Sequence, residues 1–520
     1  MAQTSPPYDE TSRNGEKSLP VEQNGNADVS TISKFRQALP QCSAVCAKNL
    51  LMLTFGSTLG FSTILIPELQ KEDSEIPVNM EELTWISSLN LFLVPIGCFV
   101  SGPVSQYLGR KKTMMIINIP FIISWIIFYY ATSAAMLFIA LALSGLTGGL
   151  LEAPVMTYVA EVTQPHLRGM LSATSSMSVI LGIFTQMLSG KLTNWRTVAL
   201  INLTYPVICL MALCLVPESP YWLAAKGKLK RAENALCWLR GWVSPTEVKA
   251  EFQHICHVVH KPAETRPKVW KEFKKRTFYM PFLLVTWAFF VGSFGGSISL
   301  QTFAVLVFEK LNAPIDQYTA AVILGLAQLL GTLICVFAIH FTGKRKLNFL
   351  SIGGTAFCFC AAAIYGCLYD NGIIDGESLR WLPTTLLIGS AFLSHVGIRL
   401  LPWILAGEVF PVQVRSSGTG AAGSIGYIFT SIANKTFLYM MNGMTLVGTF
   451  FFYGLINILG GLVLYFVLPE TEGRTLKEIE DHYLGVQSLK HKPKKESIAI
   501  KEKWAATNTV MVCDDTESKL

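Results

Sequence analysis

Two ionisable residues interrupt long apolar runs and are the first candidates for function. Glu152 stands within GGLLEAPVM and Arg399 within HVGIRLLPW. A charge in such a setting is costly, so it is a functional candidate by default, with a partner of opposite charge expected. Glu152 and Arg399 are 247 positions apart, and we predict that they form an ion pair with each other. The alternative is that backbone groups or water satisfy each charge separately.

The same offset of 247 relates two further charged motifs. AEVTQPHLRG contains Glu161 and Arg168, and GEVFPVQVRS contains Glu408 and Arg415, with the same seven-residue spacing. We expect acids and bases of different helices to pair there and to latch one mouth of the protein, because such pairs break at modest cost. The alternative is a cluster of basic residues that only marks the cytosolic side, with incidental carboxylates. Four more charges at ends of apolar runs complete the predicted gating set: Arg110, Glu218, Lys344 and Glu470.

Twelve apolar segments must position these charges. Each is about 18 to 30 residues long, enough to cross the roughly 30 Å hydrocarbon core as a helix. Only 15% of the residues are charged, well below the roughly 25% of an ordinary soluble domain. A soluble enzyme, a nucleic-acid binder and a secreted disulfide scaffold are therefore excluded. The predicted spans are about 44–66, 84–107, 114–131, 136–158, 170–189, 197–217, 279–308, 318–341, 348–368, 382–406, 418–440 and 445–468.

The predicted fold is an all-α membrane protein with two pseudo-symmetric six-helix bundles. A polar insert of short amphipathic helices separates the bundles and holds thirteen Lys and Arg residues. Because basic loops resist translocation, we place the insert in the cytosol together with both termini. The net charge of +7 then needs no nucleic acid. The predicted divisions are a disordered tail at 1–43, bundles at 44–217 and 279–468, the insert at 218–278 and a second tail at 469–520.

Matched motifs in the two halves indicate an internal repeat. YLGRKKTM in the first half corresponds to FTGKRKLN in the second, and VPESPYWL corresponds to LPETEGRTL. Such a repeat is typical of transporters built from two related bundles. At these motifs, together with PWILAGEVFPVQVR, the sequence resembles the sugar-porter family of the major facilitator superfamily. Within that family it resembles the insect facilitated trehalose transporters and animal glucose facilitators, over about residues 45 to 485. The resemblance implies the major facilitator fold, with two bundles that rock around a central site and expose it alternately to either side.

The resemblance also implies where the central site lies. Trp403 matches a Trp that commonly stacks beneath the sugar, while Gln328 and Thr58 are available as hydrogen-bonding groups. Other family positions differ here. The full candidate set for solute binding is Trp403, Glu152, Arg399, Gln328, Thr58, Ser176 and Ser293. The departures are Leu141 for the usual Arg, Ser176 for Gln, Gly292, Ser293, Gly296 and Ile298 for a Gln-Gln, Gly and Asn pattern, and Gly426 and Tyr427 for Asn-Trp.

Passive transport is predicted because the first span has no Asp, Glu, Lys or Arg between Asn49 and Ile66. Proton-coupled sugar porters usually carry an acid there, although Glu152 or His395 remain open as proton carriers. We therefore expect a facilitative uniporter of a sugar such as a hexose or trehalose, at the plasma membrane. Two alternatives stay open: a transporter of a charged or zwitterionic organic solute read by Glu152 and Arg399, and a non-transporting receptor that kept the fold.

Enzymatic chemistry has no support in the sequence. No hydrolase elbow, zincin motif, P-loop or metal-ligand cluster is found, so we predict no enzyme activity, no cofactor and no metal. The expected partners are a small-molecule solute and the lipid bilayer. The final residues, from Ser518 to Leu520, match both a peroxisomal address and a PDZ ligand. A three-residue pattern carries little information, and chance is the favoured interpretation.

Overall fold

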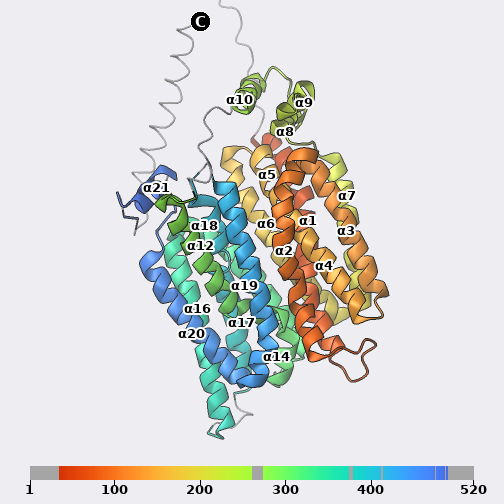
Figure 1. Ribbon diagram of the computed structural model, residues 1–520, viewed down its shortest axis with the longest axis vertical. Coiled ribbons are helices and arrows are strands. Elements are labelled where there is room, and N and C mark those ends of the chain that lie inside the picture. The colour runs from red at the N-terminus through yellow and green to blue at the C-terminus, as the bar shows by residue number, and fades with distance from the viewer. Residues whose placement is uncertain are drawn as a thin grey trace, which may run out of the picture.

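The chain folds almost entirely into α-helices, which form two side-by-side bundles (Figure 1). Eleven described segments are long and apolar enough to cross a membrane. The twelfth predicted span lies within α19 (Arg415–Gly443), which is long enough but richer in Gly, Ser and Thr. It packs against α2 (Met80–Leu108) and α12 (Arg276–Phe294). Because these helices shield it from lipid, α19 can span the membrane with a lower hydropathy than the other helices. The predicted all-α membrane fold is confirmed. The computed structural model describes residues 34–260, 273–373, 379–411, 414–474, 476–486 and 488–489.

The helix order follows the predicted six-and-six arrangement. The helix α1 begins at Lys34, so the predicted boundary at residue 44 falls inside the first helix. The tail before residue 34 and the end motif Ser518 to Leu520 lie outside the described residues. The first bundle contains α1 (Lys34–Leu69), α2, α3 (Arg110–Tyr130), α4 (Ala134–Leu150), α5 (Glu152–Val162), α6 (Pro165–Leu192) and α7 (Trp195–Leu215). The second contains α12, α13 (Ser297–Thr302), α14 (Ala304–Lys310), α15 (Gln317–Thr342), α16 (Lys344–Asp370), α17 (Trp381–Val396), α18 (Leu401–Glu408), α19 and α20 (Thr445–Val467).

Short helices cover one end of the two bundles. The insert forms α8 (Pro220–Ala225), α9 (Leu229–Leu239) and α10 (Lys249–His260), which lie beyond the membrane-spanning helices at the top of Figure 1. The helix α21 (Leu476–Leu484) lies at the same end. We call this end the insert side and the opposite end the distal side.

Two membrane-spanning helices break beside the charges that interrupt their sequence. In the fourth span, α4 ends at Leu150 and α5 begins at Glu152. Pro154 explains this break, because a proline has no N–H and its ring clashes with the carbonyl four residues earlier. In the tenth span, α17 ends at Val396 and α18 begins at Leu401, just before Pro402. The breaks therefore place Glu152 and Arg399 where backbone groups also lose their helical partners.

A serine from a neighbouring helix bridges each break. Ser101 of α2 donates to the Leu150 carbonyl at 2.6 Å and accepts the Ala153 N–H at 3.1 Å. Ser351 of α16 does the same in the second bundle, with distances of 2.7 Å to the Leu393 carbonyl and 3.0 Å from the Ile398 N–H. Backbone groups inside a membrane must be satisfied within the protein. The serines thus make both breaks tolerable.

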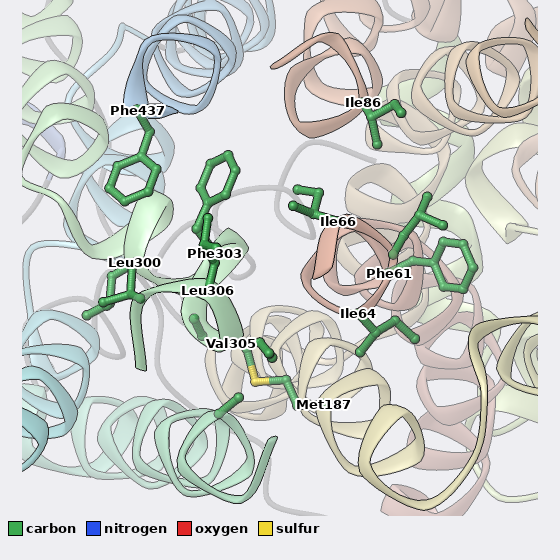
Figure 2. Close-up of a cluster of buried hydrophobic side chains, with 14 of the residues drawn as sticks. Phe61, Ile64, Ile66, Ile86, Met187, Leu300, Phe303, Val305, Leu306 and Phe437 are labelled. Carbon is green, nitrogen blue, oxygen red and sulfur yellow. The ribbon is translucent and has the colours of Figure 1, made fainter. Parts of the chain in front are cut away.

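The two bundles are joined on the distal side by a large apolar cluster. Figure 2 shows side chains of both bundles gathered around this contact, with an aromatic pair, Phe303 and Phe437, whose ring centroids lie 4.6 Å apart. Polar bonds also cross the contact: Ser431 donates to the Ser88 carbonyl at 3.0 Å, and Thr63 to the Gln301 carbonyl at 3.1 Å. We call this contact the distal seal. Its labelled members are Phe61, Ile64, Ile66, Ile86 and Met187 from the first bundle and Leu300, Phe303, Val305, Leu306 and Phe437 from the second.

Close helix packing within the first bundle depends on glycine, and this generates a stability prediction. A Cβ atom on Gly149 of α4 would lie 2.0 Å from the Val94 carbonyl oxygen of α2. Because both atoms belong to backbone, the helices must separate. We expect Gly149→Ala to lower the free energy of unfolding by about 1–3 kcal/mol, measured as a lower thermal midpoint of the purified protein.

Gly102 of α2 is the matched control, since no heavy atom lies within 4 Å of a Cβ added there. Gly102→Ala should keep the midpoint of the parent protein. Equal midpoints for the two variants would contradict this account of the packing.

Candidate functional site

A network of charges on the insert side ties together the helices of the first bundle. Arg110, the first residue of α3, forms a two-pronged ion pair with Glu161 of α5, with N···O distances of 2.9 and 3.2 Å. Ser219 donates a short hydrogen bond to the same carboxylate. Glu218 accepts the backbone N–H of Lys111 at 2.9 Å, a position where the free amides and dipole of a helix N-terminus favour an anion. Arg110, Glu161 and Glu218 therefore come together as predicted.

The second bundle repeats this network with equivalent residues. The Lys344 Nζ atom lies 2.7 Å from Glu408 and 3.0 Å from Glu472. Thr471 donates to Glu408 at 2.8 Å, as Ser219 does to Glu161. Glu470 accepts the backbone N–H of Lys344 at 3.1 Å. The repeat seen in the sequence is thus a repeat of hydrogen bonds as well.

Two glycines allow the carboxylates to approach the helix N-termini. Gly109 and Gly343 precede α3 and α16 with φ angles of 105° and 86°, which other residues rarely adopt. A Cβ atom on either glycine would lie 2.6 Å from a carboxylate oxygen of Glu218 or Glu470. Glycine is therefore required at both places by conformation and by space.

Arg168 and Arg415 do not join these networks. Arg168 donates to the Thr163 carbonyl and Arg415 to the Phe410 carbonyl, both at 3.3 Å and both within their own segments. Neither arginine forms an ion pair with a described residue, and one terminal nitrogen of Arg415 is buried without a partner. The expected latch at these two arginines is thus not engaged, while the distal seal is formed. In this conformation the bundles are held together on the distal side, while Arg168 and Arg415 on the insert side bond only to backbone carbonyls of their own segments.

A first prediction concerns this latch. Removing Arg168 or Arg415 should penalise the conformation in which the insert side is closed, because a base that could pair across the mouth is lost. A reporter, Ser176→Cys, placed in a background without other exposed cysteines, should react faster with a membrane-impermeant thiol reagent applied from the insert side. A loss of about 1 kcal/mol corresponds to about a fivefold change in population.

The control for the latch is Lys346→Ala, which removes an exposed cation at the start of α16. It should leave the labelling rate of the reporter unchanged. The same rate in Arg168→Ala, Arg415→Ala and the control would mean that neither arginine takes part in closure.

Glu152 bonds to the opposite bundle through a residue that sequence reasoning did not select as a partner. Its Oε1 atom accepts a hydrogen bond of 2.7 Å from the Tyr427 hydroxyl of α19. The predicted ion pair with Arg399 is not formed, and among the described residues Glu152 has no ion-pair partner. The carboxylate of Glu152 lies beside α19 at the helix break and binds the hydroxyl of Tyr427 there. The sequence does contain a signal for this partner, because Tyr427 stands at one of the positions where the chain departs from the family it resembles.

Arg399 carries the uncompensated charge of the site. Its backbone N–H bonds to the Ser394 carbonyl at 3.0 Å within the break. Its side chain is only partly buried, and no described residue forms an ion pair or side-chain hydrogen bond with it. A cation near the middle of a membrane persists when water or a ligand solvates it. Arg399 is therefore the strongest candidate on this chain for contact with a polar or anionic group of a solute.

An aromatic group adjoins these charges. Trp403 of α18 is half-buried and packs edge to face on Phe289, with ring centroids 4.9 Å apart. It also lies 5.5 Å from Tyr427. Tyr427 therefore connects the carboxylate of Glu152 with the indole of Trp403. Glu152, Trp403 and Tyr427 therefore form one cluster between the bundles. The first two were predicted as solute-binding residues, and Tyr427 was not.

The remaining predicted solute-binding residues differ in whether their polar side-chain atoms already have hydrogen-bond partners. Thr58 donates to the Phe55 carbonyl at 2.8 Å, and Ser293 bonds to Thr430 at 3.0 Å, so both hydroxyls are already engaged. Ser176 of α6 is half-buried. Gln328 of α15 is fully buried, and neither polar atom of its amide has a hydrogen-bond partner. An unpaired amide is costly inside a protein, so Gln328 keeps its place among the candidates.

Lys48 is a buried charge that sequence reasoning missed. It lies in α1 with no exposed surface and donates a short hydrogen bond to Ser175 of α6. Lys48 lies inside the predicted span 44–66, one residue before the uncharged stretch from Asn49 to Ile66. The available signal was a lone lysine inside a helix that begins at Lys34.

The bond between Glu152 and Tyr427 yields a second prediction. Tyr427→Phe removes the hydroxyl and leaves the half-buried carboxylate of Glu152 without its hydrogen-bond partner, which costs about 1–3 kcal/mol. We expect a lower thermal midpoint for Tyr427→Phe and a smaller additional loss when Glu152→Gln is combined with it. A double-mutant cycle of unfolding free energies measures this coupling.

Tyr439→Phe provides the control, because Tyr439 lies on the same helix with an exposed side chain. It should show no coupling to Glu152→Gln. Strictly additive effects of Tyr427→Phe and Glu152→Gln would show that the bond contributes nothing to stability.

Comparison with known proteins places this geometry among membrane carriers. Residues 48–483 match the family described as "Sugar (and other) transporter". The facilitated trehalose transporters Tret1 of Apis mellifera ligustica and Bombyx mori are 26% and 27% identical to the chain, over 86% and 85% of this chain and 88% and 86% of theirs. A Tret1 of Aedes aegypti is 28% identical over 84% of this chain, which spans about half of that relative's length (54%).

Solved structures show the same fold. The proton:xylose symporter XylE bound to 6-bromo-6-deoxy-D-glucose superposes with a TM-score of 0.67 at 20% identity, covering 86% of this chain and all of the other (100%). The inward-open conformation of XylE from E. coli gives a TM-score of 0.68 at 18% identity, covering 84% of this chain and 98% of that one. At this level of identity the likeness concerns the fold alone.

Proposed function

Because the chain belongs to the family of sugar transporters, we propose that it moves a sugar such as a hexose or trehalose by facilitated diffusion, through alternating access. The observation that carries this proposal is the asymmetry of the two ends. The distal seal joins the bundles, whereas Arg168 and Arg415 bond only within their own segments. A protein with one end sealed and an unengaged latch at the other is equipped to exchange these two states.

Trp403 is the residue that we assign to the sugar itself. Its indole is half-buried and held from the side by Phe289. A flat aromatic surface packs against the C–H faces of a sugar ring, whereas nearby polar groups bind its hydroxyls. Arg399 and Glu152 supply such groups, and the trehalose transporters among the relatives support a sugar as solute.

The insert side is proposed to face the cytosol at the plasma membrane. The thirteen Lys and Arg residues of the insert favour this orientation. The distal seal then closes the extracellular entrance. Arg168, Arg415, Glu161 and Glu408 are proposed to close the cytosolic entrance when the distal seal opens.

Transport is proposed to be independent of a proton gradient. The helix α1 has no acidic residue between its first residue, Lys34, and Glu68 near its distal end. Glu152 is held by Tyr427, and Lys48 is enclosed between α1 and α6. No acid is thus free at the position where proton-coupled relatives need one.

A second candidate function is favoured by Arg399. Its charge has no acidic partner among the described residues, and a solute that brings a carboxylate would supply one. The chain would then carry a charged or zwitterionic organic solute through the same two states. A receptor that binds a sugar without moving it is the remaining alternative, and measurement of flux separates it from both transporters.

The proposed function is tested with purified protein in proteoliposomes. Radiolabelled glucose, trehalose, gluconate and glycine should be compared, and we expect saturable uptake of a neutral sugar that is equal at external pH 6 and pH 7.5. Uptake that favours gluconate or glycine would instead support the second candidate. Uptake driven by external acid would exclude the uniporter, and binding without uptake would indicate a receptor.

Trp403→Ala gives the third prediction. Loss of the aromatic surface should raise the half-saturating sugar concentration about tenfold, because aromatic packing of this kind contributes on the order of 1 kcal/mol beyond its buried area. Trp381→Ala is the matched control, since Trp381 lies at the distal start of α17 with an exposed side chain. Equal half-saturation in both variants would remove Trp403 from the site.

A further inference from the structure

A cavity outside the transport pathway lies between the first bundle and the insert. Its volume is about 590 Å³, and it is an open pocket lined by the insert-side ends of α3 and α7 and by α8 and α9. These helices meet at the level where the chain leaves the membrane-spanning bundle, at the top of Figure 1. We call this cavity the insert pocket.

Positive charge dominates the insert pocket. Lys111, Lys112, Lys228 and Arg231 line it, against the single carboxylate of Glu218. The oxygens of Glu218 already accept the first backbone N–H groups of α3. Lys112, Lys228 and Arg231 are exposed, and none of the three forms an ion pair with a described residue. Four cations thus line the pocket against one carboxylate, and three of the four have no ion-pair partner among the described residues.

Tryptophan fixes the shape of the basic wall. Trp222 is buried and donates its indole N–H to the Gln106 carbonyl at 2.9 Å, which anchors α8 to the end of α2. The ammonium group of Lys228 lies 5.7 Å from the centre of the Trp222 ring. Trp238 lines the same cavity from α9. The cations are therefore carried by a wall that the protein holds in place.

Part of the lining of the insert pocket is apolar and continues onto the outer surface of the first bundle. Met115 of α3 and Leu215 of α7 line the cavity. Leu215 is 80% exposed, and Met211, one turn earlier on α7, is 58% exposed. Exposed apolar residues at the end of a membrane-spanning helix contact acyl chains. The pocket therefore combines apolar groups that can contact an acyl chain with cations that have no ion-pair partner among the described residues.

We propose that the insert pocket binds an anionic phospholipid of the cytosolic leaflet. The phosphate and acidic headgroup lie against Lys112, Lys228 and Arg231. The part of an acyl chain nearest the headgroup lies along Met115 and Leu215. Anionic lipids are attracted to basic residues at the cytosolic surface, so the charge of the pocket matches the leaflet that the proposed orientation presents. A bound lipid holds α8 and α9 at the membrane surface beside the first bundle. This binding does not depend on which solute is carried.

Native mass spectrometry of the full chain tests the proposal. The purified, delipidated protein is mixed with equal amounts of dioleoyl phosphatidylserine and dioleoyl phosphatidylcholine, and retained lipid is counted. We expect one phosphatidylserine to be retained in preference to phosphatidylcholine, and this preference to fall about tenfold or more in Lys112→Ala/Lys228→Ala/Arg231→Ala. The control variant Lys249→Ala/Lys274→Ala/Lys346→Ala removes the same charge from the same side and should keep the preference.

The apolar wall is tested independently. Leu215→Ser should lower retention of phosphatidylserine, whereas Leu192→Ser, at an exposed residue of the distal side, should not. Soluble glycerophosphoserine should fail to displace the lipid at equal concentration, and displacement would mean that the pocket reads soluble phosphates rather than a lipid. Equal loss in the pocket and control triple variants, or no preference for phosphatidylserine in the parent protein, would overturn the proposal.

Discussion

The need to bond every backbone polar group inside the hydrocarbon core governs this structure. Unbroken helices meet that need on their own, but Pro154 and Pro402 interrupt two of them near the middle of the membrane. Ser101 and Ser351 restore the lost bonds from neighbouring helices. Only with those serines in place do the breaks become stable positions for an acid and a base. The candidate site thus depends on two serines that bond the backbone of the helix breaks.

The bundles are connected by interactions of different kinds at different depths. Apolar side chains and short polar bonds join them on the distal side, and one hydroxyl-to-carboxylate bond from Tyr427 to Glu152 joins them centrally. On the insert side each bundle satisfies its own charges, Arg110 with Glu161 and Lys344 with Glu408. Relative movement of the bundles therefore leaves the charge network within each bundle intact, and each bundle can move as a rigid body.

The sequence predicted the architecture because hydrophobic length and the matched motifs are properties of single segments. It also predicted that charges at helix ends gather on one side, but not that Arg110 pairs with Glu161 in particular. The partner of Glu152 was wrong, because a symmetric offset says nothing about the direction in which a helix break turns a side chain. Lys48 was missed although it lies inside the predicted span 44–66, because the absence of charge was considered only from Asn49 to Ile66. The insert pocket depends on how three cations from two helices meet at a membrane edge, and no linear pattern encodes that.

The apolar character of the distal seal has a thermal consequence. Attraction between apolar surfaces is largely entropic near room temperature and weakens on cooling. The closure built from Phe303, Phe437 and their neighbours therefore loses strength in the cold. The free energy that holds the distal side shut is thus set by heat capacity as well as by contact area.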